Sequence, residues 1–158
     1  MTANNLPLAV PLKVDVTTDD KITPHEIEYS FRLMFDERSI SVLAYNLETI
    51  LAEKLETVLS RNIGNTRPRD FYDIHILNAL RGAEFDVALL RQALNKTTLK
   101  RNSLPTIGNY RQIIEHIKTD PQMKGFWETY GNEYEYAKGI TFDETCETIV
   151  RIMEMISE

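Results

Sequence analysis

The spacing of hydrophobic side chains changes close to residue 45. Before that point apolar and polar residues alternate, most clearly between Ile27 and Phe35. Alternation with a period of two is typical of a strand with one buried face. We therefore expect strands at residues 12–16, 27–35 and 40–45, with a polar turn at residues 36–39. The pattern predicts a small, mostly antiparallel three-stranded unit with one buried face.

After residue 45 the hydrophobic period becomes that of a helix. Asn46 is a good N-cap, Asp86 and Asp120 precede two further helices, and Thr141 with Glu144 forms a capping box. Helices are expected at residues 47–61, 69–81, 87–99 and 110–118, from residue 121, and from the capping box to about residue 156, with a connection at residues 103–108. We predict an α+β protein in which residues 1–45 form the strand unit and residues 46–158 a helical bundle.

Two of these helices carry charges on faces that should be buried. A helical projection of residues 47–61 places Lys54 and Arg61 inside the apolar stripe or on its edge, and Glu56 on the opposite side. In the next helix Asp70 and Asp73 fall within the apolar arc. If the two helices pack as neighbours, Lys54 and Arg61 face Asp70 and Asp73, which avoids the cost of burying an unpaired charge.

The residues alone leave two interpretations of this cluster open. Arg61 in a last turn and Asp70 in a first turn both complement the helix dipole and need no further explanation. Lys54 and Asp73 have no such explanation. They form either a structural ion pair at the edge of the core or part of a functional site.

The composition is that of a globular protein in a reducing compartment. The 158 residues carry a formal net charge of −6 and a single cysteine, Cys146, so no internal disulfide can form. The sequence contains no apolar run long enough to cross a bilayer and no convincing signal peptide. These features predict a cytoplasmic protein with no membrane partner.

One stretch departs from the acidic average. No acidic residue occurs between Val87 and Ile114, whereas five basic residues do. They are Arg91, Lys96, Lys100, Arg101 and Arg111. A locally basic segment can attract a polyanion such as RNA, and it can equally be a solvated helix face.

The charged helices resemble a known family. The residues from Asn46 to Leu55 read NLETILAEKL; Arg61 follows, and then Arg69 to Ile74 read RDFYDI. This order is similar to the AbiEii/AbiGii family of nucleotidyltransferase-like toxins, in which an E-x-x-L-A-E-K-L helix is followed by an arginine and an R-D-x-Y-D helix. The resemblance covers the chain from about Leu12 to Leu80.

The resemblance implies a polymerase-beta-like nucleotidyltransferase fold that acts with Mg²⁺ and a nucleoside triphosphate. Studied members are toxins of toxin–antitoxin or abortive-infection (phage-defence) systems, and some transfer nucleotides to the acceptor end of tRNA. By this resemblance Lys54, Arg61, Asp70 and Asp73 would bind the nucleotide, with Lys54 and Asp70 also catalytic. Asp15 would hold Mg²⁺ or activate the attacking hydroxyl; the alternative is a solvent-facing strand residue.

The sequence departs from the family at its N-terminal end. The family places a Gly-Ser turn and an Asp-x-Asp pair upstream of the third carboxylate, and the fourteen residues before Asp15 contain neither. We therefore expect the C-terminal part of such a toxin, inactive alone, with an upstream N-terminal half or a cognate antitoxin as its protein partner. The alternative is a non-catalytic protein-interaction module derived from the same fold.

Overall fold

The computed structural model describes residues 2–5, 8–11 and 22–157. Four strands form two antiparallel pairs: β1 (Thr2–Asn5) with β2 (Leu8–Pro11), and β3 (Ile27–Arg32) with β4 (Ser39–Ala44). Seven α-helices follow: α1 (Leu47–Arg61), α2 (Pro68–Arg81), α3 (Val87–Arg101), α4 (Leu104–Gly108), α5 (Tyr110–Thr119), α6 (Pro121–Glu133) and α7 (Phe142–Ser157). Two 3₁₀ turns are inserted at Asn62–Gly64 and Glu135–Ala137. The predicted α+β class is confirmed.

The described residues do not show the predicted three-stranded unit. They contain two separate two-stranded sheets, and the first of the three expected strands, at residues 12–16, lies outside the described residues. The other two expected strands are β3 and β4, paired so that Tyr29 faces Val42 and Phe31 faces Ile40.

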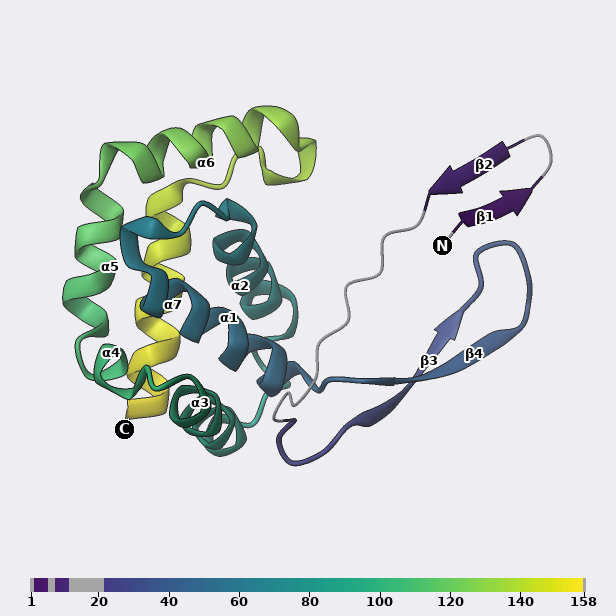
Figure 1. Ribbon diagram of the computed structural model, residues 1–158, viewed down its shortest axis with the longest axis horizontal. Coiled ribbons are helices and arrows are strands. Elements are labelled where there is room, and N and C mark those ends of the chain that lie inside the picture. The colour runs from purple at the N-terminus through teal and green to yellow at the C-terminus, as the bar shows by residue number, and fades with distance from the viewer. Residues whose placement is uncertain (1, 6–7, 12–21, 158) are drawn as a thin grey trace.

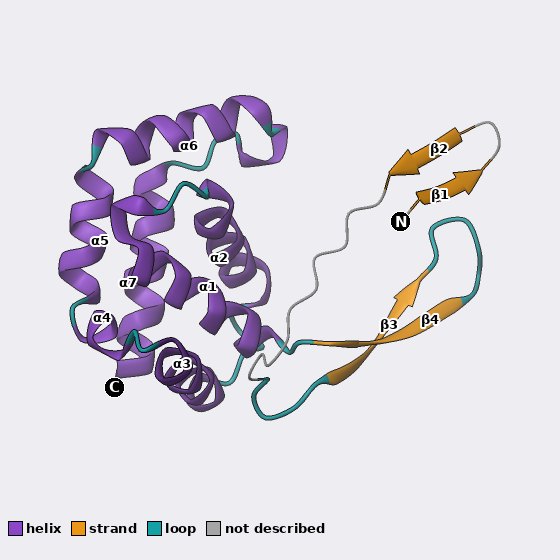
Figure 2. Cartoon of the chain, in the orientation of Figure 1, coloured by secondary structure: helices purple, strands orange, loops and turns teal. Residues whose placement is uncertain are grey.

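The β3–β4 hairpin also lacks the predicted buried face. Every residue of β3 is exposed, and only Ala44 of β4 is partly covered. The hairpin extends away from the helices (Figures 1 and 2), so its apolar side chains have no second layer to pack on within the described chain. An alternating sequence makes one face apolar, but burial also requires a partner element.

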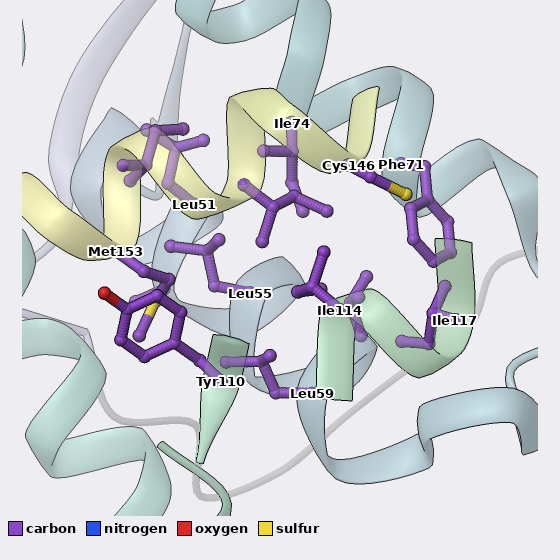
Figure 3. Packing of buried hydrophobic residues seen from close by; sticks show 14 of the residues in the cluster. Leu51, Leu55, Leu59, Phe71, Ile74, Tyr110, Ile114, Ile117, Cys146 and Met153 are labelled. Carbon is purple, nitrogen blue, oxygen red and sulfur yellow. The ribbon is translucent and has the colours of Figure 1, made fainter. Parts of the chain in front are cut away.

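The helices form a separate body around α1 and α7. Helix α1 contacts α2, α3 and α5, and α7 contacts α2, α3 and α5 from the other side. Figure 3 shows the resulting core, in which Leu51 and Leu55 of α1 meet Ile74 of α2, Ile114 of α5 and Met153 of α7. The thiol of Cys146 lies in this core, and burial raises its pKa to about 12.

The helix ends follow the predicted caps. The side chain of Asn46 accepts a hydrogen bond from the Thr49 amide at 3.0 Å, and Asp86 and Asp120 cap α3 and α6 in the same way. At α7 the Thr141 amide donates to Glu144 at 2.7 Å, and the Glu144 amide donates back to the Thr141 hydroxyl at 3.2 Å. The capping box is therefore confirmed, whereas the connection expected at residues 103–108 contains the short helix α4.

The segment before β3 is fixed to the start of α1. The amide of Thr23 donates to the Thr49 hydroxyl at 3.1 Å, and the Asn46 side-chain amide donates to the Thr23 carbonyl at 2.6 Å. The hairpin thus begins and ends beside one helix terminus. Among the helices described, none is long and apolar enough to span a bilayer.

Candidate functional site: a charged cluster between α1 and α2

The ammonium group of Lys54 lies between two carboxylates of the next helix. Its Nζ atom is 2.6 Å from Asp73 Oδ2 and 3.4 Å from Asp70 Oδ1. Because Asp70 and Asp73 are three residues apart on α2, both side chains project from the same face toward α1. The predicted contact of Lys54 with both aspartates is confirmed.

Local sequence fixes the position of both aspartates. Pro68 starts α2 and places Asp70 in the first turn, where a carboxylate is stabilised by the helix dipole. Arg69 is mostly exposed, and its Nε atom approaches Asp73 Oδ2 at 3.6 Å. The two carboxylates are therefore balanced by one ammonium group from α1 and one guanidinium group from α2.

The cluster is only partly open to solvent. The exposed fractions of the side chains are 23% for Lys54, 14% for Asp70 and 21% for Asp73. Within the described residues Asp70 Oδ2 is buried without a hydrogen-bond partner. An unsatisfied buried carboxylate oxygen costs on the order of 1–3 kcal/mol.

A hollow of about 260 Å³ opens beside the cluster. It is lined by Ile50, Glu53, Lys54, Thr57, Arg67, Asp70 and Arg101. Lys54 and Asp70 thus contribute to the wall of a cavity as well as to the contact between two helices. The arrangement can present an anchored ammonium group to an anion that enters the hollow.

Arg61 does not join this cluster, contrary to the prediction. Its guanidinium has no contact with Asp70 or Asp73 in the described part of the chain, and it lines a second hollow with Glu56, Arg67 and Arg101. Arg61 shares a face with Lys54 but lies about 10 Å farther along the helix, given a rise of about 1.5 Å per residue. The 3₁₀ turn at Asn62–Gly64 and the three residues before α2 separate its end of α1 from the aspartates.

The projection of α1 also misplaced Glu56. It is buried, with a side-chain exposure of 3%, and it pairs with Arg101 at the end of α3. Helix α3 packs against the side of α1 that a single-helix projection assigns to solvent. Arg67, which no sequence pattern indicated, lines both hollows. The one signal in the sequence that could have indicated Arg67 is its position: it is a third cation, after Lys54 and Arg61, and lies in the connection between the two charged helices.

The basic stretch is spread over different surfaces. Arg91 donates to the carbonyl of Ile156 at 2.5 Å, and Arg111 pairs with Glu154 at 2.6 Å, so both contact the end of α7. Arg101 points toward α1 instead. Lys96 is exposed on α3, and Lys100 follows it one turn later. The five predicted RNA-contacting residues therefore do not form one patch, and only Arg101 lies beside the Lys54 cluster.

The described residues do not include the predicted metal ligand. Asp15 lies outside the described residues. No group of three or more His, Cys, Asp or Glu side chains suited to a metal occurs in residues 2–5, 8–11 and 22–157. Asp70 and Asp73 are the two carboxylates at the cluster, and both face Lys54, so they do not form a metal site by themselves.

Comparison with known families shows a match over most of the chain. The family described as "Nucleotidyl transferase AbiEii toxin, Type IV TA system" matches residues 2–145. The matched region contains β1 to α6 and the whole of the Lys54 cluster. Comparison with curated proteins and with solved structures gives no match.

Proposed function

This chain belongs to the AbiEii nucleotidyl transferase toxin family of type IV toxin–antitoxin systems, and from that premise we propose that the Lys54 cluster binds the triphosphate of a nucleoside triphosphate. The nucleotide is transferred to an RNA acceptor such as tRNA. Membership in a toxin–antitoxin family also implies an antitoxin partner.

The unsatisfied oxygen of Asp70 supports a functional over a purely structural cluster. Two carboxylates hold one lysine at the wall of a hollow, and one of their oxygens has no hydrogen-bond partner in the described chain. A buried polar atom without a partner is uncommon in native proteins, and a catalytic role or a bound ion is among its explanations. We assign Asp70 and Asp73 as positioning residues that hold the Lys54 ammonium group through these two contacts.

The chemistry assigns a limited role to each residue of this chain. In nucleotidyl transfer the acceptor hydroxyl oxygen forms a bond to the α-phosphorus, its proton passes to a carboxylate, and pyrophosphate leaves. Lys54 stabilises the negative charge on the phosphate oxygens as a compact cation. Asp70 accepts a hydrogen bond from Lys54, and Arg61 contributes positive charge from the adjoining hollow. Asp15 is the carboxylate that we propose would hold Mg²⁺, which would supply positive charge beside the triphosphate.

A non-catalytic interaction module is the second candidate, and the β3–β4 hairpin favours it. Tyr29, Phe31, Ile40 and Val42 lie on one face of this hairpin, and all four are exposed. A two-stranded hairpin is marginally stable alone, so an exposed apolar face fits a binding role. This candidate predicts partner binding without nucleotide binding.

Calorimetric titration of the four ribonucleoside triphosphates with Mg²⁺ tests the proposal. The wild-type chain should bind at least one of them, and Lys54→Met should weaken that binding at least about tenfold because a charge-assisted hydrogen bond contributes about 1.5–3 kcal/mol. Lys124→Gln is the matched control, since Lys124 is exposed on α6. Equal affinities for wild type and Lys54→Met, with both proteins folded, would contradict a nucleotide site at Lys54.

A further inference from the structure

The two hollows beside α1 have three lining residues in common. The larger one, of about 420 Å³, is lined by Glu56, Thr57, Ser60, Arg61, Arg67, Arg101 and Ser103. Thr57, Arg67 and Arg101 also line the hollow at Lys54. The two hollows therefore adjoin each other at these shared residues, with Lys54 in the wall of one and Arg61 in the wall of the other.

The larger hollow is positively charged in a protein that is negative overall. Three guanidinium groups and one carboxylate line it, which gives a local charge of 3 − 1 = +2. Glu56 pairs with Arg101, and Thr57 also accepts from Arg101 at 3.4 Å. No carboxylate in the described part of the chain pairs with Arg61 or Arg67, and both residues are exposed. Two guanidinium groups are thus available to an anion.

A buried hydroxyl group supplies a second, independent observation. Ser103 lines the larger hollow, is 8% exposed, and its Oγ atom has no hydrogen-bond partner among the residues described. The chain reaches this position because Asn102 ends α3 in the left-handed conformation, with φ of 54°. A hydroxyl can donate to a phosphate oxygen, which is an acceptor only.

We propose that this larger hollow is a phosphate-binding site in which Arg61, Arg67 and Ser103 contact phosphate oxygens and the Glu56–Arg101 pair shapes the wall. Planar guanidinium groups bind phosphate bidentately, which a lysine cannot do. The phosphates come either from the triphosphate of a nucleotide or from the backbone of a single-stranded RNA. Lys54 does not line the larger hollow, so the phosphate site itself does not depend on the nucleotide site at Lys54. The inference rests on the proposed function only for the identity of the ligand.

Arg67→Gln is the diagnostic variant because Arg67 is exposed and removing it breaks no ion pair found among the described residues. Ser103→Ala is the second variant, and Lys124→Gln serves as the charge-matched control on α6. The probes are inorganic tripolyphosphate and a single-stranded oligouridylate without a triphosphate end. Binding of each is measured at several salt concentrations, and the melting temperature shows that every variant is folded.

Arg67→Gln should lower the affinity for at least one probe by about tenfold or more. Ser103→Ala should lower the affinity for the same probe to a smaller extent. If the probe is RNA, the slope of log affinity against log salt should fall by about 0.7 for the lost phosphate contact. Loss of tripolyphosphate binding alone identifies a triphosphate, and loss of RNA binding alone identifies a nucleic-acid backbone.

Two results would overturn the inference: Arg67→Gln binding both probes as Lys124→Gln does, or wild-type protein binding neither probe at low salt. Lys54→Met separates this inference from the nucleotide site. If that variant retains nucleotide binding while Arg67→Gln loses a probe, the proposed function fails and the phosphate site remains.

Discussion

The helix α1 and the β3–β4 hairpin were predicted with the same kind of evidence and have opposite environments. Helix α1 buries the side chains of eight residues, including Leu51 and Leu55 at 0% exposure. Strand β3 buries none, although Ile27, Tyr29 and Phe31 alternate as regularly as any strand requires. Periodicity reports the geometry of one element and the side on which it is apolar. It does not report whether another element is there to cover that side.

The charged residues follow the same division. Lys54 contradicts the apolar stripe of α1 and is explained by two carboxylates on the neighbouring helix. The hairpin carries charges of the ordinary kind, such as Arg38, which pairs with Asp36 at 2.6 Å within one exposed turn and thereby lowers the pKa of that carboxyl. A charge that violates a pattern is therefore more informative than one that fits it.

Truncation in the core of the helical body should have the largest effect on stability. Leu55→Ala removes a fully buried side chain from the contact among α1, α2 and α7, and it should lower the free energy of unfolding by about 2–5 kcal/mol. Urea denaturation followed by circular dichroism measures the change. A loss below about 1 kcal/mol would mean that α1 is not central to the fold.

Removing the Lys54 ammonium should have the next largest effect. Lys54→Met leaves Asp70 and Asp73 facing each other without their α1 partner, and partial exposure reduces the cost to about 1–3 kcal/mol. The triple variant Lys54→Met/Asp70→Asn/Asp73→Asn should recover part of that loss because no unpaired carboxylate remains. No recovery would show that Lys54 stabilises the helix pair by packing rather than by charge.

The sequence was sufficient to predict this cluster because its members lie on two consecutive helices. Their faces follow from a helical projection, and a short connection makes the two helices neighbours. The Glu56–Arg101 pair was not predictable in this way, since its partners are 45 residues apart and α3 reaches α1 only in the folded body. Arg67 precedes α2 and belongs to no periodic element. The prediction of a buried face on the strand unit was wrong for a related reason: the local sequence does not specify which element, if any, covers that face.

The capping box of α7 offers a smaller effect within the helical body. Thr141→Ala removes the hydroxyl that accepts from the Glu144 amide, and it should destabilise the protein by about 1 kcal/mol. Thermal denaturation measures this, with Thr129→Ala on the exposed side of α6 as the control. If Thr129→Ala loses as much stability as Thr141→Ala, loss of the helix cap does not explain the effect of Thr141→Ala.

The same box should respond to acid. Hydrogen bonds from Thr141 hold the pKa of the Glu144 carboxyl below its ordinary value of 4.5. A lowered folded-state pKa means that the stabilisation is complete above pH 4.5 and is lost as the pH falls through the lowered value. The difference in unfolding free energy between wild type and Glu144→Gln should therefore shrink as the pH falls. A difference that grows on acidification would contradict this prediction.

The smallest effect is expected in the hairpin, where Phe31→Ser replaces a ring that is 53% exposed. Its described neighbours include Ile40, directly opposite on β4, and no helix covers this face in the described part of the chain. The free energy of unfolding of the helical body should therefore change by no more than about 0.5 kcal/mol. Thermal denaturation measures this change. Sedimentation at increasing concentration supplies a second readout, because a solvent-exposed apolar face promotes association and the serine should reduce it. A loss of stability comparable to that of Leu55→Ala would show that the hairpin is packed in solution, against the helices or a second chain. The contrast between the two regions would then reflect a missing contact rather than two different kinds of surface.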